Sequence, residues 1–467
     1  MTFLWFGIGI ILPAFTGWLL VRLCEGRHLV LFAPERWALG FLLGLTGTMF
    51  VTFLAHIAGL ILFTRLGFLS VQVTFALLLI LARFLQWKFS PRPTPYAPPH
   101  TSSSVRPWLT FLLILLTVWT IAKIALGTFI LVSTPPYFDD TLKNWNYRAK
   151  VFTLTHRLDI GTTPEENGSL SGYPPTVPLS KAWLATLSGQ WNEGLMNSIH
   201  IVWFLVALIL LYCALRHRAS MPWALLGTYL LASLPLYLFD GLNAYADVFL
   251  SAHLLAAVTL TTRGLTETDA RRRGSLLRLA ALATGLLVIT KNEALVLYLP
   301  LLIAILIGGL AFLHRRNRMS RREIQHILAW TAGWLFAIGA PWILFKWTHG
   351  LTFGNAKSLS GSYSFGWQPG VPYVLWVNTF FEGNWHLLFP LLLLLLVIGH
   401  KHLLRSIMAP LALFVLAATL LQTGLFLFTS LSAEALRQTG LARGFVQLAP
   451  LAVLLTTLLM RDTLRKE

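Results

Sequence analysis

The sequence predicts an all-α, polytopic integral membrane protein, and its composition carries most of that prediction. Of 467 residues, 56% are hydrophobic and only 12% are charged, and the mean hydropathy is +0.68. Many apolar runs are long enough to cross a bilayer, which takes about 20 helical residues. The two cysteines, Cys24 and Cys213, both lie beside apolar segments without disulfide or zinc-site spacing. The chain is therefore expected to fold in a membrane.

About thirteen spans emerge when hydropathy is averaged over a window of about 19 residues. They begin near residues 3, 37, 67, 109, 197, 221, 245, 276, 294, 326, 386, 407 and 444. The first lacks the basic region that opens a secretory signal, so we expect it to be retained as a span.

The formal net charge of +18 reflects membrane topology in this chain. Arginine and lysine cluster in alternate connections, around residues 22–36, 83–106, 216–218, 263–278, 315–322, 401–405 and 461–466. Basic connections face the cytoplasm. This alternation predicts an external N-terminus and a cytoplasmic C-terminus, and it argues against a nucleic-acid partner.

The span pattern divides the chain into three parts. Residues 1–90 are expected to form an N-terminal three-span extension, 91–108 a Pro/Ser-rich cytoplasmic linker, and 109–467 a transmembrane module that carries the candidate site. The long connections of that module, at about 132–196, 348–385 and 431–443, fall on the external side.

Several ionisable residues interrupt apolar sequence near the predicted external face. They are Asp139 and Asp140 after the fourth span, Asp247 in the seventh, Lys291 and Glu293 between the eighth and ninth, and Arg443 at the start of the last. A charge costs roughly 2.5 to 3.5 kcal/mol at mid-membrane depth and less near the interface. Several on one face predict a shared polar cavity, our candidate active site.

The segment after the acid pair predicts an amphipathic helix in the plane of the interface. Leu142, Trp145, Ala149 and Phe152 share one helical face, and Lys143, Asn146, Arg148 and Lys150 lie elsewhere around the turn. One aspartate would cap this helix, which leaves the other for a second role. The proline-rich stretch from Tyr173 to Pro178 is suited either to lining a groove or to a rigid turn without a ligand.

These motifs resemble the GT-C superfamily of polytopic glycosyltransferases, which take a sugar from a polyprenyl-phosphate carrier. Protein O-mannosyltransferases and the lipid A aminoarabinose transferase belong to it. Asp140, Leu142, Trp145, Arg148, Ala149 and Lys150 resemble a D-x-L-x-x-W-x-x-K-A-K pattern, with arginine in place of the first lysine. YPPTVPL, NAYADVFL, TKNEAL and ARGFVQLAP resemble later signatures in the same order. Two features depart from the family: three spans precede the segment that normally comes first, and no large C-terminal extramembrane domain follows.

The resemblance implies an inverting glycosyltransferase at the external, periplasmic face of a bacterial inner membrane. Such a reaction needs a base for the acceptor's proton and positive charge for the departing phosphate. The implied roles are Asp140 as base with Asp139 beside it, and Lys291 and Arg443 as phosphate ligands, with Arg148 and Lys150 as alternatives or lipid anchors. Asp247 would bind sugar hydroxyls or hold Lys291, and Glu293, Trp145 and Tyr173 are further candidates for substrate contacts.

The sequence leaves other choices open. The same carboxylates could carry protons in a lipid or solute transporter or flippase, although the unusual charges concentrate at one face and no repeated half is evident. The expected partners are the polyprenyl-phosphate sugar donor, membrane lipid and an acceptor that is a lipid, glycan, protein or other small molecule. No cofactor is required by the motifs, and a divalent metal stays an option because metal dependence varies within the family.

Overall fold

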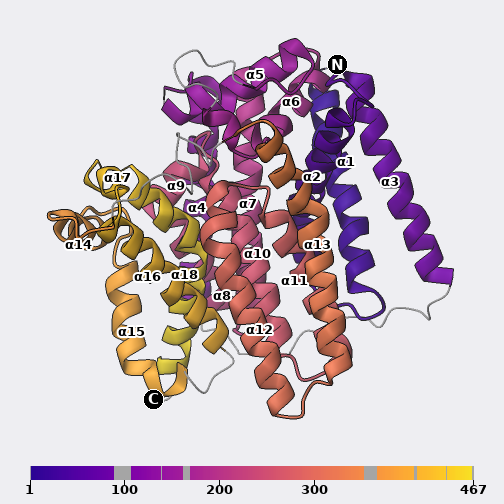
Figure 1. Ribbon diagram of the computed structural model, residues 1–467. Coiled ribbons are helices and arrows are strands. Elements are labelled where there is room, and N and C mark those ends of the chain that lie inside the picture. Colours follow the sequence, from indigo (N-terminus) through magenta and orange to yellow (C-terminus); the bar gives the residue numbers. More distant parts are fainter. Residues whose placement is uncertain are drawn as a thin grey trace.

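The computed structural model describes residues 2–88, 107–137, 139–160, 169–351, 365–403, 408–437 and 439–464. Helices account for all regular structure in these ranges, and none of them contains a β-strand. The chain begins at the end of the helical bundle drawn uppermost in Figure 1 and reaches its C-terminus at the opposite end.

The helices follow one another closely along the chain. In order they are α1 (Thr2–Glu25), α2 (Ala33–Ile57), α3 (Arg65–Lys88), α4 (Pro107–Ser133), η1 (Thr141–Trp145), α5 (Asn146–Thr155), η2 (Ser169–Gly172), α6 (Thr176–Ser188), α7 (Glu193–Arg216), α8 (Met221–Ser233), α9 (Pro235–Gly241), α10 (Asp247–Thr266), α11 (Ala270–Leu287), η3 (Ala294–Tyr298), α12 (Leu299–Arg315), α13 (Arg321–Thr348), α14 (Val371–Phe380), α15 (Leu388–Leu403), α16 (Ala409–Phe428), α17 (Ser432–Leu436) and α18 (Gly440–Leu464).

The structure is that of a multi-pass membrane protein, but the count of thirteen spans is not confirmed. Ten helical segments in the described ranges are long and apolar enough to cross a bilayer, or eleven if the pair α8 and α9, bent by 76°, forms one broken span. The two other predicted spans coincide with α11, whose 18 residues include a run of three arginines, and with α15, whose apolar part covers only Leu388–His400. Helices therefore form at every predicted span, but α11 and α15 do not have the composition or the length needed to cross a bilayer.

Helices α1 and α2 touch backbone to backbone. A Cβ atom built on Gly17 would overlap the carbonyl oxygen of Gly40, and one built on Gly44 would overlap the carbonyl oxygen of Pro13. Small residues let helices approach this closely in a membrane, where close packing replaces the hydrophobic drive between helices. The glycine spacing in α2 therefore sets the crossing of the first two helices.

We expect Gly44→Ala to destabilise the protein by about 1–3 kcal/mol, because the added methyl group must push two backbones apart. The matched control is Gly7→Ala in α1, where nothing lies within 4 Å of the new Cβ. Alanine favours an exposed helix over glycine by roughly 1 kcal/mol, so the control should unfold no earlier than the wild type. Thermal unfolding of both purified variants checks the difference.

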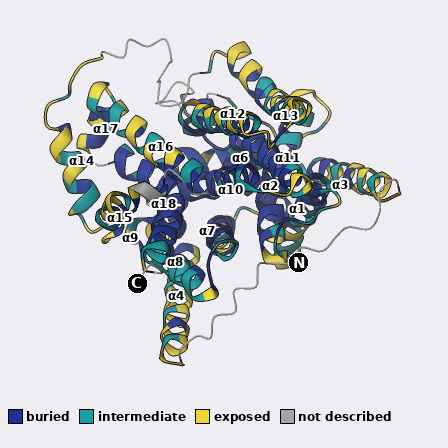
Figure 2. Cartoon of the chain, turned by 90° about the horizontal axis from the view of Figure 1, so that it is seen from below, coloured by how far each residue is buried: buried dark blue, intermediate teal, exposed yellow. Residues whose placement is uncertain are grey.

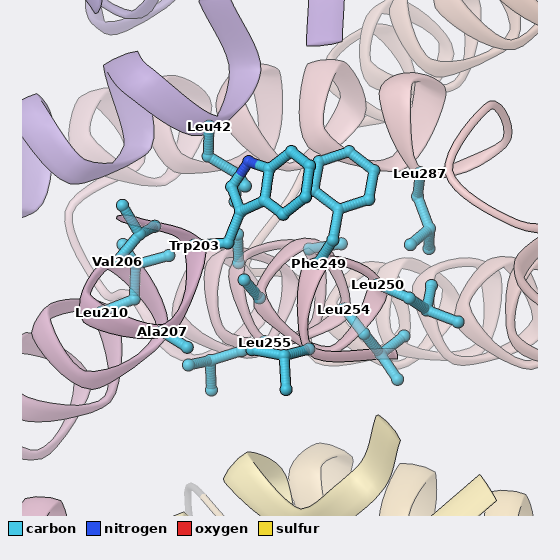
Figure 3. Close-up of a cluster of buried hydrophobic side chains, with 14 of the residues drawn as sticks. Leu42, Trp203, Val206, Ala207, Leu210, Phe249, Leu250, Leu254, Leu255 and Leu287 are labelled. Carbon is cyan, nitrogen blue, oxygen red and sulfur yellow. The ribbon is translucent and has the colours of Figure 1, made fainter. Parts of the chain in front are cut away.

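The N-terminal helices share one apolar core with the rest of the chain. Figure 3 shows part of it, where Trp203 of α7 and Phe249 of α10 lie with Leu42 of α2 and Leu287 of α11. The Trp203 and Phe249 ring centroids are 4.5 Å apart. In Figure 2, α10 is buried on all sides while α3 and α4 stand at the periphery with exposed faces. Apolar residues all round a helix are typical of such a central position.

Buried ion pairs tie several helix ends together at the end where the C-terminus lies. Glu25 accepts from Arg36 Nε at 2.7 Å. Glu35 accepts from Arg263 Nη1 at 2.6 Å and lies 2.7 Å from His217 Nε2. These contacts bring the ends of α1, α2, α7 and α10 together. Three of the predicted basic connections thus gather at one end, which we call the basic end.

Candidate functional site

A buried carboxylate organises the opposite end of the bundle. Asp247 is the first residue of α10 and has no exposed surface. Its Oδ1 accepts hydrogen bonds from Lys291 Nζ at 2.8 Å and Gln447 Nε2 at 2.6 Å, and its Oδ2 accepts from Arg443 Nε at 2.9 Å. A buried charge is tolerated when its hydrogen bonds are satisfied in this way. Asp247 therefore fixes two cations that come from distant parts of the chain.

Lys291 lies in the short connection between α11 and η3 and is also buried. Its Nζ is 3.1 Å from Glu293 Oε1 in addition to its bond with Asp247. Burial alone would lower the pKa of Lys291, but the two carboxylates outweigh that effect and raise the pKa above its ordinary value. The ammonium group stays charged at neutral pH.

Arg443 lies in the first turn of α18 and joins Asp247 to a second carboxylate, that of Asp140, which its Nη1 contacts. The ring of Tyr245 lies 5.1 Å from the guanidinium carbon. The side chain of Arg443 is 28% exposed and that of Asp140 is 36% exposed, whereas Asp247 is fully covered. Arg443, Asp140 and Glu293, whose side chain is 39% exposed, are therefore the members of this cluster that can meet a ligand.

A cavity of about 220 Å³ adjoins the cluster. Its polar wall includes Tyr173, Asp247, Lys291, Glu293, Arg443 and Gln447. Its apolar wall includes Val296 and Leu297 of η3, Leu425 and Phe426 of α16, and Leu431. Val296 is 46% exposed on the outside of the bundle, so the apolar wall continues to the lipid-facing surface. The charged wall also includes Glu434, so the cavity combines a wall of mixed charge, with Lys291 and Arg443 as its cations, and an apolar wall.

The structure brings together Asp140, Asp247, Lys291, Glu293 and Arg443, as the sequence analysis expected. Asp139 stands apart: it is exposed and has no hydrogen bond or ion pair with another described residue. Tyr173 lines the cavity, and Trp145 is buried behind it, with the two ring centroids 5.7 Å apart. Trp145 therefore supports the wall without lining it.

Arg148 and Lys150 lie outside the cavity. Arg148 is buried, and its guanidinium donates to Asn144 Oδ1 at 3.2 Å and to the carbonyl of Tyr173 at 3.1 Å. Burial lowers the pKa of Arg148 to about 9. Arg148 thus holds the Tyr173 segment and is too enclosed to anchor the helix to lipid, whereas Lys150 is exposed.

The predicted amphipathic face is correct for Trp145, Ala149 and Phe152, which are buried, and wrong for Leu142, which is 46% exposed. The reason is a change of helix type. Residues 141–145 form the π-helical η1 and the regular α5 starts only at Asn146, so the regular 3.6-residue spacing does not hold across the junction. Such π-helical turns are frequent at functional sites.

The buried amino group of Lys181 holds this segment against α6. Lys181 of α6 has no exposed surface, and its Nζ donates to Asn146 Oδ1 at 2.5 Å and to Asn197 Oδ1 at 2.9 Å. Glu193 accepts from Asn146 Nδ2 at 2.7 Å. Lys181 lies in the second turn of α6, which starts at Thr176. The Lys181 network therefore positions the chain just after Asp140.

Lys181 should make stability depend on pH. Burial lowers its pKa from 10.5 to about 7, an effect that Glu193 partly opposes. The unfolded chain binds this proton more readily, so the free energy of unfolding should rise with pH between 7 and 10.5, by up to about 1.4 kcal/mol per unit. Urea unfolding at pH 7 and 9 measures this effect. Lys181→Met should reduce the increase in the free energy of unfolding between the two pH values, and Lys150→Met should leave that increase unchanged. Equal slopes for all three proteins would contradict the prediction.

Gln447 is the main site residue that was not predicted from the sequence. It lies four residues after Arg443 on the same face of α18, a spacing that could have indicated it. Its Oε1 accepts from Tyr298 Oη at 2.8 Å while its amide donates to Asp247. Lys346 and Asn292, which both donate to the carbonyl of Gly172, were also missed, because no local pattern reveals such long-range contacts.

A resident metal ion finds few ligands in this arrangement. No group of three or more His, Cys, Asp or Glu residues that could hold a metal occurs in the part of the chain that the structure describes. The carboxylates of Asp140 and Asp247 already neutralise Arg443 and Lys291. The described part of the cluster consists of side-chain cations paired with side-chain carboxylates.

Comparison with models of known protein families gives no match to this sequence, and comparison with curated proteins gives none either.

Proposed function

We propose that the protein is an inverting, GT-C-like glycosyltransferase that moves a sugar from a polyprenyl-phosphate donor to an acceptor. The observation that supports this most is the place of Arg443. It is a partly exposed guanidinium between two carboxylates, at a cavity with one charged wall and one apolar wall. Those two walls match the phosphate and the hydrocarbon chain of such a donor.

In this proposal the donor phosphate binds Arg443, whose planar fork suits two phosphate oxygens. Lys291 contributes charge from behind, since its Nζ bonds Asp247 and lies against Glu293. The first isoprene units lie along Val296, Leu297 and Leu425, and the remainder of the chain extends into the bilayer. The sugar then projects toward Asp140.

The chemistry is a single displacement at the anomeric carbon. Phosphate competes with Asp140 for Arg443, so donor binding releases a carboxylate that is paired in the free protein. Asp140 takes the proton of the acceptor hydroxyl, the acceptor oxygen forms a bond to the anomeric carbon, and the bond from that carbon to the phosphate oxygen breaks. Arg443 stabilises the charge that develops on the phosphate, and one displacement inverts the configuration.

We place this end of the bundle at the external face of the membrane, which for a bacterial chain is the periplasmic side of the inner membrane. The support is the gathering of basic connections at the opposite end, since such connections stay cytoplasmic. A carrier-linked donor fits that setting because its chain remains in lipid while its phosphate reaches the surface.

The test is transfer of label from a panel of radiolabelled polyprenyl-phosphate sugars in membranes that contain the protein. Wild type should move label from one of the donors to an acceptor, and Arg443→Gln should lose the transfer. The matched control is Arg437→Gln, an exposed arginine in the same loop region that does not line the cavity, and it should transfer as wild type does.

Two results would overturn the proposal. One is equal transfer by wild type and Arg443→Gln. The other is donor that crosses to the opposite leaflet without loss of its sugar, which would favour the transporter or flippase, since alternating access needs a route to both faces.

A further inference from the structure

The basic end carries a groove that the proposed reaction does not use. It has a volume of about 620 Å³ and runs between the first turns of α11 and α13. Its charged lining consists of Arg273, Arg278, Arg322, Glu323 and His326, and Met319, Ile327 and Ala329 supply apolar surface. With three arginines and one glutamate, the groove carries a net positive charge even when His326 is neutral.

Arg273 presents a guanidinium to the groove that no carboxylate of the described residues holds by a hydrogen bond. Only 4% of its surface is exposed, yet its nearest acidic group, Glu323 Oε1, lies 3.8 Å from Nη2, too far for a hydrogen bond. Among the described residues, its guanidinium donates no hydrogen bond at all. None of its nitrogen atoms is among the fully buried polar atoms without a hydrogen-bond partner, so water reaches the guanidinium from the groove. An anionic ligand in the groove would replace that water and accept charge-assisted hydrogen bonds.

The neighbouring groups are engaged differently and leave that role to Arg273 and Arg322. Arg278 donates to the carbonyl of Cys24 at 3.0 Å and to Ser275 Oγ at 3.0 Å, so it adds charge from a fixed position. Glu323 caps α13 by accepting from the Ser320 amide at 2.8 Å. Arg322 is exposed at the rim.

The place of the groove favours a lipid over a soluble anion. It lies where two helices begin at the basic end, the level at which phospholipid headgroups meet a membrane protein. One turn further along α13, Trp330 stacks beside His326, with ring centroids 6.5 Å apart. Tryptophan is typical of the membrane interface, where its ring lies at headgroup level. Apolar lining beside the arginines would accept the upper part of an acyl chain.

We infer that this groove binds the phosphate headgroup of an anionic phospholipid at the membrane face opposite the cavity. The phosphate oxygens accept hydrogen bonds from Arg273 and Arg322, and the lipid joins α11 to α13. This site is independent of the proposed transferase reaction.

The experiment titrates phosphatidylglycerol into the purified full chain in an uncharged detergent and follows the thermal unfolding midpoint. Phosphatidylglycerol should raise the midpoint, and phosphatidylcholine at the same concentration should not. Arg322→Gln should raise the half-saturating concentration of phosphatidylglycerol about tenfold, which is the loss of affinity expected for one charge-assisted hydrogen bond. Because Arg322 is exposed, this variant keeps the fold, while Arg273→Gln tests the buried group directly.

The matched control is Arg315→Gln, an exposed arginine at the same end that does not line the groove. Its titration should superimpose on that of wild type. Equal weakening in Arg315→Gln and Arg322→Gln would overturn the proposal in favour of general surface charge. Equal stabilisation by inorganic phosphate would overturn the lipid assignment and show a site for a soluble anion.

Discussion

In the proposed transferase reaction, the Asp140→Asn substitution is expected to lower the rate of sugar transfer by about 10²–10⁴, the usual contribution of a general base. Asparagine keeps the size of the side chain and a contact with Arg443, but it cannot take the acceptor's proton. Label transfer from the donor should therefore fail while donor binding persists. Single-turnover transfer, measured together with donor binding by the same membranes, separates the two effects.

Asp139→Asn is the control, because it removes a neighbouring carboxylate that is exposed and unpaired among the described residues. Its transfer rate should stay within a few fold of the wild-type rate. The opposite pattern, with transfer lost in Asp139→Asn and kept in Asp140→Asn, would assign the base to the adjacent residue.

Substituting Asp247 should have the largest effect on stability at the candidate site. Asp247→Asn removes the charge that Lys291 and Arg443 share, and it leaves the ammonium of Lys291 buried beside Glu293 alone. Breaking a buried ion pair on one side costs about 3–5 kcal/mol. Chemical unfolding of the purified protein should show a loss of that size.

Asp462→Asn provides the comparison, since Asp462 forms an ion pair with the adjacent Arg461 and its side chain is 36% exposed. Exposed pairs of this kind contribute up to about 1 kcal/mol. The double variant Asp247→Asn with Lys291→Met should recover part of the loss, because no unpaired ammonium remains. A loss below about 1 kcal/mol in Asp247→Asn would contradict the role of this carboxylate.

The charged residues of the candidate site could be predicted because charges are rare and costly within apolar, membrane-spanning sequence. In apolar sequence, Asp247, Lys291 and Arg443 are costly unless they meet, and the alternation of basic connections places them at one end. Local patterns could not foretell their exact partners. The sequence predicts that Arg148 is an exposed cation on a helix. In the structure it is buried and donates a hydrogen bond to the carbonyl of Tyr173, 25 residues further along the chain.

The number of spans was harder to predict than the existence of the helices. Hydropathy located α11 and α15, but it could not tell that α11 is apolar because it is buried in the bundle, or that the apolar part of α15 is too short to cross a bilayer. The π-helical turn at η1 could not be predicted either, because local sequence does not show that Lys181 of α6 contacts Asn146 just after this turn. Tertiary contacts decide both features.

The buried carboxylates of the basic end imply an order of assembly during synthesis. Glu25 finds its partners nearby, since Arg22 and Arg36 flank it in sequence. Glu35 depends on His217 and Arg263, which follow it by 182 and 228 residues. A buried carboxylate without partners is costly, so α2 cannot settle into its final position when it leaves the ribosome. The hairpin of α1 and α2 therefore reaches its final position only after α10 has been inserted. Glu35 then joins α2, which is synthesised early, to α7 and α10, which are synthesised later.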